Sequence, residues 1–291
     1  MIRHFFYSLR PRQWIKNLLI FMPLVFGKKL FVYPENLCVA AGFVIFSLVA
    51  SSVYLVNDLW DLELDKSHRT KRLRPIPSGK IGAGTAASAA AVLAAVSVGA
   101  AYFLEPRLAL VILVYLALNL IYTRRLKHIV IIDVFCLAAF FLIRIVAGTV
   151  LADVAYSHWM LFMVVLLALF LGFNKRRQEL RASRSEAGEQ RSVLRQYGLY
   201  FIDQMISVLT SSVVIVYMLY TIDSKTVGEV GSNHLIYTIP FVYYGIFRYL
   251  YLVHKRHYGE DPTSVVYTDR MIQLNLLVWM AACVAVIYYG L

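Results

Sequence analysis

Three aspartates follow an apolar stretch at spacings that place them on one side of a helix. The segment reads Asn57-Asp58-Leu59-Trp60-Asp61-Leu62-Glu63-Leu64-Asp65. If the helix of the apolar stretch continues, each residue turns by about 100°. Asn57 and the aspartates at 58, 61 and 65 then share a face, whereas Glu63 points elsewhere, to solvent or a basic partner. Carboxylates on one face repel one another unless a cation lies between them, and oxygen ligands favour Mg²⁺. We therefore predict a magnesium site with Asn57, Asp58, Asp61 and Asp65 as ligands; the alternative is an acidic helix end neutralised by the next loop.

The loop that follows these aspartates is strongly basic. Residues 66–80 include six Lys or Arg among fifteen residues. Taken alone, this is an ordinary cytoplasmic loop of a membrane protein. Directly after a metal-type face it suggests a diphosphate clamp, in which Mg²⁺ holds phosphate oxygens on one side and Arg and Lys hold them on the other. Pro75 and Pro77 would stiffen that loop.

Two further charged residues lie within the apolar stretch 129–151. Asp133 and Arg144 are eleven residues apart, so they share a helix face but are separated by roughly 16 Å of helix rise and cannot pair directly. Each needs a partner elsewhere in the protein, because a charge inside a membrane is expensive. We expect Asp133 to face the aspartates across a central cavity; the alternative for both residues is a structural polar network.

A third polar cluster, Asn174-Lys175-Arg176-Arg177-Gln178-Glu179, follows another apolar stretch. Lys175 and Glu179 are one helical turn apart and could form a simple pair within the helix. The other interpretation is that this helix end contributes to the same site as the aspartates. The residues alone leave both open.

The elements that must position these groups are membrane helices. Of the 291 residues, 60% are hydrophobic and 16% are charged, and the mean hydropathy is +0.65. Because about 20 apolar residues span a bilayer as a helix, we predict an all-α, polytopic protein, a single domain over 1–291 with nine transmembrane helices. Pro23 interrupts the first. A signal peptide is the alternative there, because Arg3, Arg10 and Arg12 precede a short apolar run, but no cleavage pattern follows. The nine stretches are 17–26, 37–56, 81–104, 108–122, 129–151, 159–173, 205–222, 235–247 and 271–291.

The distribution of basic residues supports nine spans. If the N-terminus is cytoplasmic, then the loops 61–80, 124–128, 174–204 and 254–270 are cytoplasmic too, and with the N-terminal arm they hold 23 of the 29 Lys and Arg. This is the positive-inside pattern. The net charge of +12 thus mostly reflects the basic cytoplasmic loops of a membrane protein. A nucleic-acid partner is not expected, because no soluble domain remains to bind one. The three cysteines lie apart in apolar stretches and have no metal or disulfide spacing.

With these residues in place, the chain resembles a known family. Asn57-Asp58-x-x-Asp61-x-x-x-Asp65 is similar to the first aspartate motif of the UbiA superfamily of intramembrane prenyltransferases, which have nine helices around a central cavity. Several stretches are closer to its decaprenyl-phosphate phosphoribosyltransferase branch. The superfamily's second motif usually has two aspartates four apart, whereas Asp133 is followed by Leu137; this departure favours the branch over a two-magnesium prenyl diphosphate site. The matching stretches are 10–17, 54–58, 70–76, 126–128, 142–148, Lys175-Arg176-x-x-Glu179, Glu260-Asp261-Pro262 and Asp269-Arg270.

The resemblance implies Mg²⁺-dependent transfer of a 5-phosphoribosyl group from phosphoribosyl pyrophosphate to a polyprenyl phosphate, for a cell-wall precursor, at the cytoplasmic side of a bacterial-type inner membrane. Asp58, Asp61 and Asp65 would then be the catalytic carboxylates that hold the metal. We expect Lys71, Arg72, Arg74 and Lys127 to bind the donor phosphates and Arg12, Lys16, Lys175 and Arg176 to bind the lipid phosphate, supported by Asp133, Arg144 and Glu179.

Three alternatives remain open at this point. A UbiA-type enzyme could transfer an isoprenyl group from a prenyl diphosphate to an aromatic or other acceptor. A transporter is less expected, because its acids should lie mid-helix and its halves should repeat. A binding protein that has lost catalysis is the third. Membrane lipids are expected around the helices, and homo-oligomer formation stays open.

Overall fold

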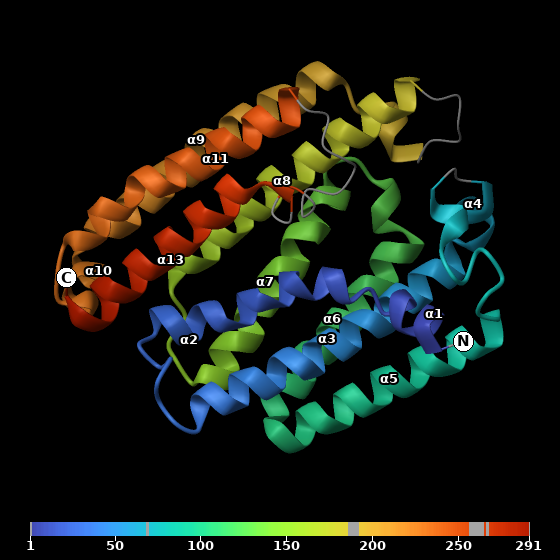
Figure 1. Ribbon diagram of the computed structural model, residues 1–291, viewed down its shortest axis with the longest axis horizontal. Helices are drawn as coiled ribbons and strands as arrows, with labels where there is room; N and C mark the ends of the chain where they lie inside the picture. The colour runs from blue at the N-terminus through green and yellow to red at the C-terminus, as the bar shows by residue number, and fades with distance from the viewer. Residues whose placement is uncertain (1, 68–69, 186–191, 256–264, 266–267, 291) are drawn as a thin grey trace. The chain divides into compact units, whose positions relative to one another are not determined.

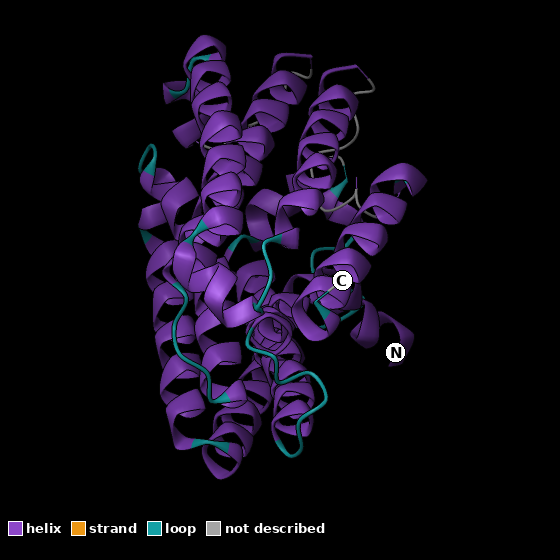
Figure 2. Cartoon of the chain, turned by 90° about the vertical axis from the view of Figure 1, so that its left-hand side faces the viewer, coloured by secondary structure: helices purple, strands orange, loops and turns teal. Residues whose placement is uncertain are grey.

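The computed structural model describes residues 2–67, 70–185, 192–255, 265 and 268–290. Within these residues the chain consists of helices and connecting loops, with no strand (Figures 1 and 2). It divides into two compact units, one formed by residues 1–136 and 140–155, the other by 137–139 and 156–291. The all-α prediction is confirmed.

The first unit contains the N-terminal helices and the candidate site. Its 3₁₀ helix η1 is unusually long, because such helices rarely exceed four residues. The elements of this unit are α1 (Ile2–Ser8), η1 (Pro11–Phe21), α2 (Met22–Phe26), α3 (Glu35–Trp60), α4 (Leu62–Ser67), η2 (Lys71–Leu73), α5 (Ala83–Leu104), α6 (Pro106–Arg124), η3 (Leu126–His128) and most of α7 (Ile132–Ala152).

The second unit is built from the remaining helices. Its elements are α8 (His158–Ser185), η4 (Ser192–Gln196), α9 (Leu199–Ile222), α10 (Ser224–Val230), η5 (His234–Thr238), α11 (Ile239–Lys255) and α13 (Arg270–Tyr289). Within it α8 packs on α9 and α11 packs on α13.

Seven of the described helices are long and apolar enough to cross a membrane: α3, α5, α6, α7, α8, α9 and α13. The other two expected spans are composite, since a 3₁₀ helix runs into an α-helix in each. Residues 11–26 are η1 followed by α2; at about 2.0 Å per 3₁₀ residue and 1.5 Å per α residue they extend about 30 Å, the thickness of a bilayer core. Residues 234–255 are η5 followed by α11. The nine-span prediction thus becomes seven continuous helices and two composite segments.

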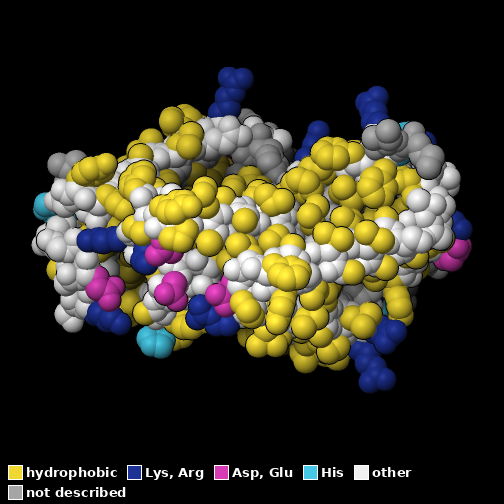
Figure 3. Space-filling model, turned by 90° about the horizontal axis from the view of Figure 1, so that it is seen from below, with side chains coloured by type: hydrophobic (Ala, Val, Ile, Leu, Met, Phe, Trp, Pro, Cys, Tyr) yellow, Lys and Arg dark blue, Asp and Glu magenta, His cyan; other side chains and the backbone are white. Residues whose placement is uncertain are grey.

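Small residues let these helices pack closely together, and large apolar side chains cover their outward faces. The buried face of α5 is Ala86, Ala90, Ser97 and Ala101, and it packs on α3, as small residues allow helices in a membrane to approach closely. Outward-facing side chains are large and apolar, with Phe103 89% exposed and Leu277 69% exposed. Hydrophobic side chains cover much of the face in Figure 3.

The predicted loops 61–80, 124–128 and 174–204 all contain helical segments. α8 continues through Asn174 to Ser185, so the polar cluster at 174–179 lies inside a helix rather than at its end. The reason is that Lys, Arg, Gln, Glu and Leu are strong helix formers and extend a helix beyond its apolar part. Residues 61–80 contain α4 and η2.

Candidate active site

The end of α3 brings Asp58 and Asp65 onto one side, where Arg74 contacts both. α3 ends at Trp60, yet Asp61 N donates to Asn57 O at 3.0 Å and Asp65 N donates to Asp61 O at 2.8 Å. The i to i+4 hydrogen bonds of a helix therefore continue almost without a break from α3 into α4. Asp58 and Asp65 are buried, at 2% and 4% exposed. Glu63 is exposed and pairs with Lys66 at 2.7 Å, which agrees with the direction predicted for it.

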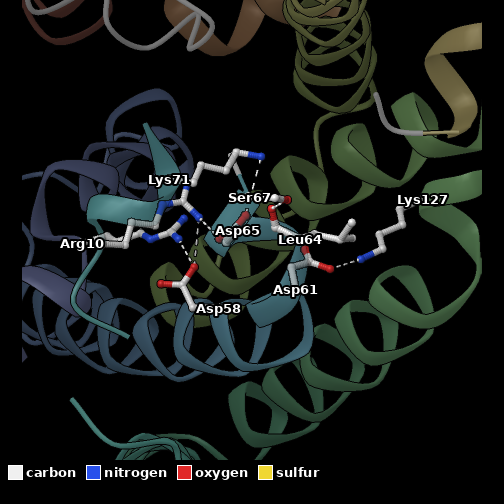
Figure 4. Close-up of polar contacts among 9 residues, drawn as sticks. Arg10, Asp58, Asp61, Leu64, Asp65, Ser67, Lys71 and Lys127 are labelled. Atoms are coloured by element: carbon white, nitrogen blue, oxygen red, sulfur yellow. Dashed lines mark hydrogen bonds and ion pairs between the residues drawn. The ribbon is translucent and has the colours of Figure 1, made fainter. Parts of the chain in front are cut away.

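Arg74 joins two of these carboxylates. Its Nη1 lies 3.1 Å from Asp58 Oδ1 and 2.7 Å from Asp65 Oδ2. Arg10 also donates to Asp58 Oδ1, and Lys71 Nζ lies 3.9 Å from Asp65 Oδ1. Figure 4 shows the side chain of Arg10 directed toward Asp58 and that of Lys71 toward Asp65. We call Arg10, Asp58, Asp65, Lys71 and Arg74 the carboxylate cluster.

Arg10 is the residue of this cluster that sequence reasoning did not assign to the site. It lies in the left-handed region, with φ 53°, just before η1, and its guanidinium stacks 5.1 Å from the centroid of the Tyr54 ring. Burial lowers the pKa of Arg10, and the Asp58 carboxylate opposes that change. A strained backbone at a polar site is a common mark of function. No local spacing links Arg10 to a carboxylate 48 residues away; the only signal was its place in the matching stretch 10–17.

Asp61 points away from the carboxylate cluster toward Lys127 on η3 (Figure 4). Lys127 Nζ lies 2.7 Å from Asp61 Oδ1, and Lys127 is 8% exposed. Beside it, Thr123 Oγ1 donates to Asn57 Oδ1 at 2.6 Å, from α6 to α3. The side-chain oxygen of Asn57 thus already accepts a hydrogen bond, and its role as a metal ligand stays a prediction.

The carboxylates have the chemistry that a hard divalent cation requires, but each one is paired with a basic side chain. Within the residues described here, no three acidic, His or Cys side chains gather closely enough to hold a metal ion. A cation therefore competes with Arg10, Arg74 and Lys127 for the carboxylates, and it gains them when these basic groups turn to another anion. A diphosphate is such an anion, since guanidinium and ammonium groups bind phosphate as well as they bind carboxylate.

The other residues predicted for the site have varied surroundings in the first unit. Arg72 is exposed and takes no part in the carboxylate ion pairs that are described. Arg12 is exposed and Lys16 half-buried, both on η1. Asp133 is fully buried in the first turn of α7. Arg144 is also buried, and it donates to the Asn17 side chain rather than to a carboxylate.

The second unit carries the cluster on α8. Arg176 is 1% exposed and donates to Glu179, so the described ion pair of Glu179 is with Arg176; Lys175 is half-buried. Arg177 donates to Asp203 on α9, a contact that sequence reasoning did not foresee. Asp269 pairs with Arg248 at 2.8 Å, whereas Glu260, Asp261 and Pro262 lie outside the described residues. A shared role of these groups with Arg12 and Lys16 stays a prediction.

Comparison with known proteins places the chain in a family. It is 36% identical to a decaprenyl-phosphate phosphoribosyltransferase of Mycobacterium tuberculosis over 97% of this chain and 94% of that protein. It is 34% identical to one of Corynebacterium glutamicum over 97% and 86%. A UbiA homolog from Archaeoglobus fulgidus bound to DMAPP and Mg²⁺ has the same fold, with a TM-score of 0.72 at 16% identity over 98% of this chain and 99% of that one. The model of the UbiA prenyltransferase family matches residues 18–277, and the chain belongs to that family of membrane enzymes.

Proposed function

We propose that this enzyme transfers a 5-phosphoribosyl group from phosphoribosyl pyrophosphate to a polyprenyl phosphate and releases diphosphate. The relatives that match nearly the whole chain carry the name of that activity. The observation that supports it most is the carboxylate cluster, in which Arg10 and Arg74 contact the buried Asp58 and Asp65 at and just after the end of α3. Such a cluster suits a diphosphate substrate that binds with a divalent cation, because the acids can bind the cation and the basic groups can bind the phosphates.

The proposed reaction needs no general base. An oxygen of the lipid phosphate, already anionic, forms a bond to C1 of the ribose as the bond from C1 to the diphosphate oxygen breaks with its electron pair. Asp58 and Asp65, joined by Asp61 once it has released Lys127, would hold Mg²⁺, which would supply charge neutralisation for the leaving diphosphate. Arg10, Lys71, Arg74 and Lys127 would turn from the carboxylates to the diphosphate oxygens and orient them.

The lipid phosphate requires a second basic cradle. Arg12 and Lys16 on η1 would supply cations for it. The role expected of Lys175 and Arg176 on α8 stays a prediction from the sequence. The positive-inside distribution supports a cytoplasmic N-terminus and a cytoplasmic site in a bacterial-type inner membrane, where a soluble phosphosugar could reach the enzyme.

The test uses the purified full chain in detergent with Mg²⁺, labelled phosphoribosyl pyrophosphate and a polyprenyl phosphate. Label is expected in the organic extract, and it should disappear with EDTA and in Asp58→Asn. Glu63→Gln is the matched control, because Glu63 lies on α4 but is exposed and paired only with Lys66 among the described contacts. Turnover of a prenyl diphosphate without transfer of phosphoribosyl label would instead support the isoprenyl transfer.

A further inference from the structure

The long 3₁₀ helix η1 carries Arg10 to Asp58, and its unusual geometry has a visible cause. Residues three apart in a 3₁₀ helix lie on one face and rise about 6 Å, while residues four apart in an α-helix also rise about 6 Å. Side chains three apart on a 3₁₀ helix can therefore meet side chains four apart on a neighbouring α-helix. η1 makes such matches with both α3 and α7.

The match with α3 uses two serines. Trp14 Nε1 donates to Ser51 Oγ at 3.0 Å, and Asn17 Nδ2 donates to Ser47 Oγ at 3.0 Å. The donors are three apart on η1 and the acceptors are four apart on α3. Ser51 Oγ also lies 2.9 Å from the carbonyl of Leu9, to which it donates, so the contact extends to the residue before Arg10.

The match with α7 uses Arg144 and Gly148, again four apart. Arg144 Nε donates to Asn17 Oδ1 at 2.7 Å. A Cβ added to Gly148 would lie 2.1 Å from Ile20 O, which is backbone and cannot yield cheaply. Asn17 and Ile20 are three apart on η1, so both α7 contacts fall on one face of the 3₁₀ helix.

Arg144 has the surroundings of a structural clamp. Its guanidinium also donates to Phe140 O at 2.6 Å and lies 5.1 Å from the Phe46 ring and 5.4 Å from the Tyr115 ring. Its described partners are thus neutral oxygens and aromatic rings, which stabilise a desolvated cation. Asp58 is twelve residues along α3 from Phe46, about 18 Å of helix, so Arg144 is too distant to touch a ligand of the carboxylates.

Relaxation of η1 would move Arg10. An α-helix of the eleven residues of η1 would be shorter by about 5 Å. Trp14 and Asn17 would then rise by only about 4.5 Å and would no longer match the spacing of Ser51 and Ser47 on α3. Arg10 would then lose its contact with Asp58. We propose that Arg144 and Gly148 are positioning residues that hold η1 in its extended 3₁₀ form and thereby keep Arg10 on Asp58. That Arg10 matters for catalysis rests on the proposed function; the positioning of Arg10 by Arg144 and Gly148 does not.

The test measures Mn²⁺ binding to the detergent-purified full chain by electron paramagnetic resonance, which requires no turnover. Because Arg10 competes with a cation for Asp58, Arg10→Gln should tighten Mn²⁺ binding by about fivefold or more. Arg144→Met and Gly148→Ala should each tighten it similarly, and Arg10→Gln combined with Arg144→Met should add nothing to Arg10→Gln alone. Gly99→Ala on α5 is the matched control, since an added Cβ there meets no atom within 4 Å.

Unchanged Mn²⁺ affinity in Arg144→Met and Gly148→Ala, with Arg10→Gln tightened, overturns the proposal, as does an additive double variant. Gly148→Ala keeps the test decisive if Arg144→Met does not fold. Failure of the proposed transferase reaction would appear separately, as absent label transfer by the wild-type enzyme with the Mn²⁺ pattern intact.

Discussion

Asp61 and Lys127 are 66 residues apart in the chain, and their side chains meet with Oδ1 and Nζ 2.7 Å apart. The pair joins the end of α3 to η3, which follows α6. Lys127 is almost completely buried. In the proposed reaction, this buried ammonium group would exchange the carboxylate for a phosphate oxygen of the donor.

Lys127→Met should lower kcat/KM for the donor by about 10- to 100-fold, which corresponds to the roughly 1.5–3 kcal/mol of a charged hydrogen bond. The loss should appear mainly in KM for phosphoribosyl pyrophosphate, since Lys127 would bind its diphosphate. Steady-state kinetics measure it, with Lys80→Met as the control, because Lys80 is exposed. An unchanged KM would contradict the role of Lys127.

Arg74→Gln should change metal and donor binding in opposite directions. Arg74 bridges Asp58 and Asp65, so its removal frees two carboxylates and should tighten Mn²⁺ binding in the absence of substrate. The same change removes a phosphate ligand and should raise the donor KM by about tenfold or more. Calorimetry with Mn²⁺ and steady-state kinetics provide the two values. Weakening of both would mean that Arg74 only holds the carboxylates in place.

Tyr217→Phe should destabilise the second unit without altering the candidate site residues. Trp279 Nε1 donates to the Tyr217 hydroxyl at 2.9 Å, and that hydroxyl lies 2.6 Å from Thr238 Oγ1. Since Thr238 Oγ1 donates to Leu235 O, the hydroxyl of Tyr217 donates onward to Thr238. Loss of the hydroxyl removes both of these hydrogen bonds, at a cost of about 1–3 kcal/mol. Denaturant unfolding measures it, and Tyr237→Phe, at a 72% exposed position, should have no effect beyond about 0.5 kcal/mol.

The position of the aspartates followed from the sequence because it depends on local periodicity alone. The helical hydrogen bonds continue almost without a break from Asn57 to Asp65, so angles computed along one helix placed Asp58 and Asp65 together and Glu63 apart. The same angles placed Asp61 with them, but its side chain pairs with Lys127 instead. The apolar stretches located the continuous helices for the same reason. The catalytic roles of these residues are still predictions.

The partners of the aspartates could not be predicted from local patterns. Arg10 and Lys127 reach their carboxylates over 48 and 66 residues, and no periodicity carries such information. The 3₁₀ form of η1 depends on contacts with α3 and α7, which the sequence of η1 alone does not predict. Arg144 was expected to have a partner elsewhere in the protein or a place in a structural polar network, and its described partners are an amide oxygen, a carbonyl oxygen and aromatic rings.

Asp269 should make the stability of the second unit depend on pH. It caps α13 by accepting from Ile272 N at 2.9 Å, and it pairs with Arg248 on α11. The hydrogen bond from Arg248 holds the pKa of Asp269 below its ordinary value. Because the folded state favours the carboxylate, the stabilisation is fully present above the unfolded pKa of about 3.9 and is lost as pH falls through the lower folded value.

The free energy of unfolding of wild type and Asp269→Asn, measured in detergent from pH 3 to 7, tests this. Their difference should be constant above about pH 5 and should shrink below about pH 4. In an Arg248→Met background the shrinkage should be much smaller, because the hydrogen bond that lowers the pKa is gone. A difference that grows toward acid would mean that the carboxylate of Asp269 is disfavoured in the folded protein, and that the contact between α11 and α13 does not depend on its charge.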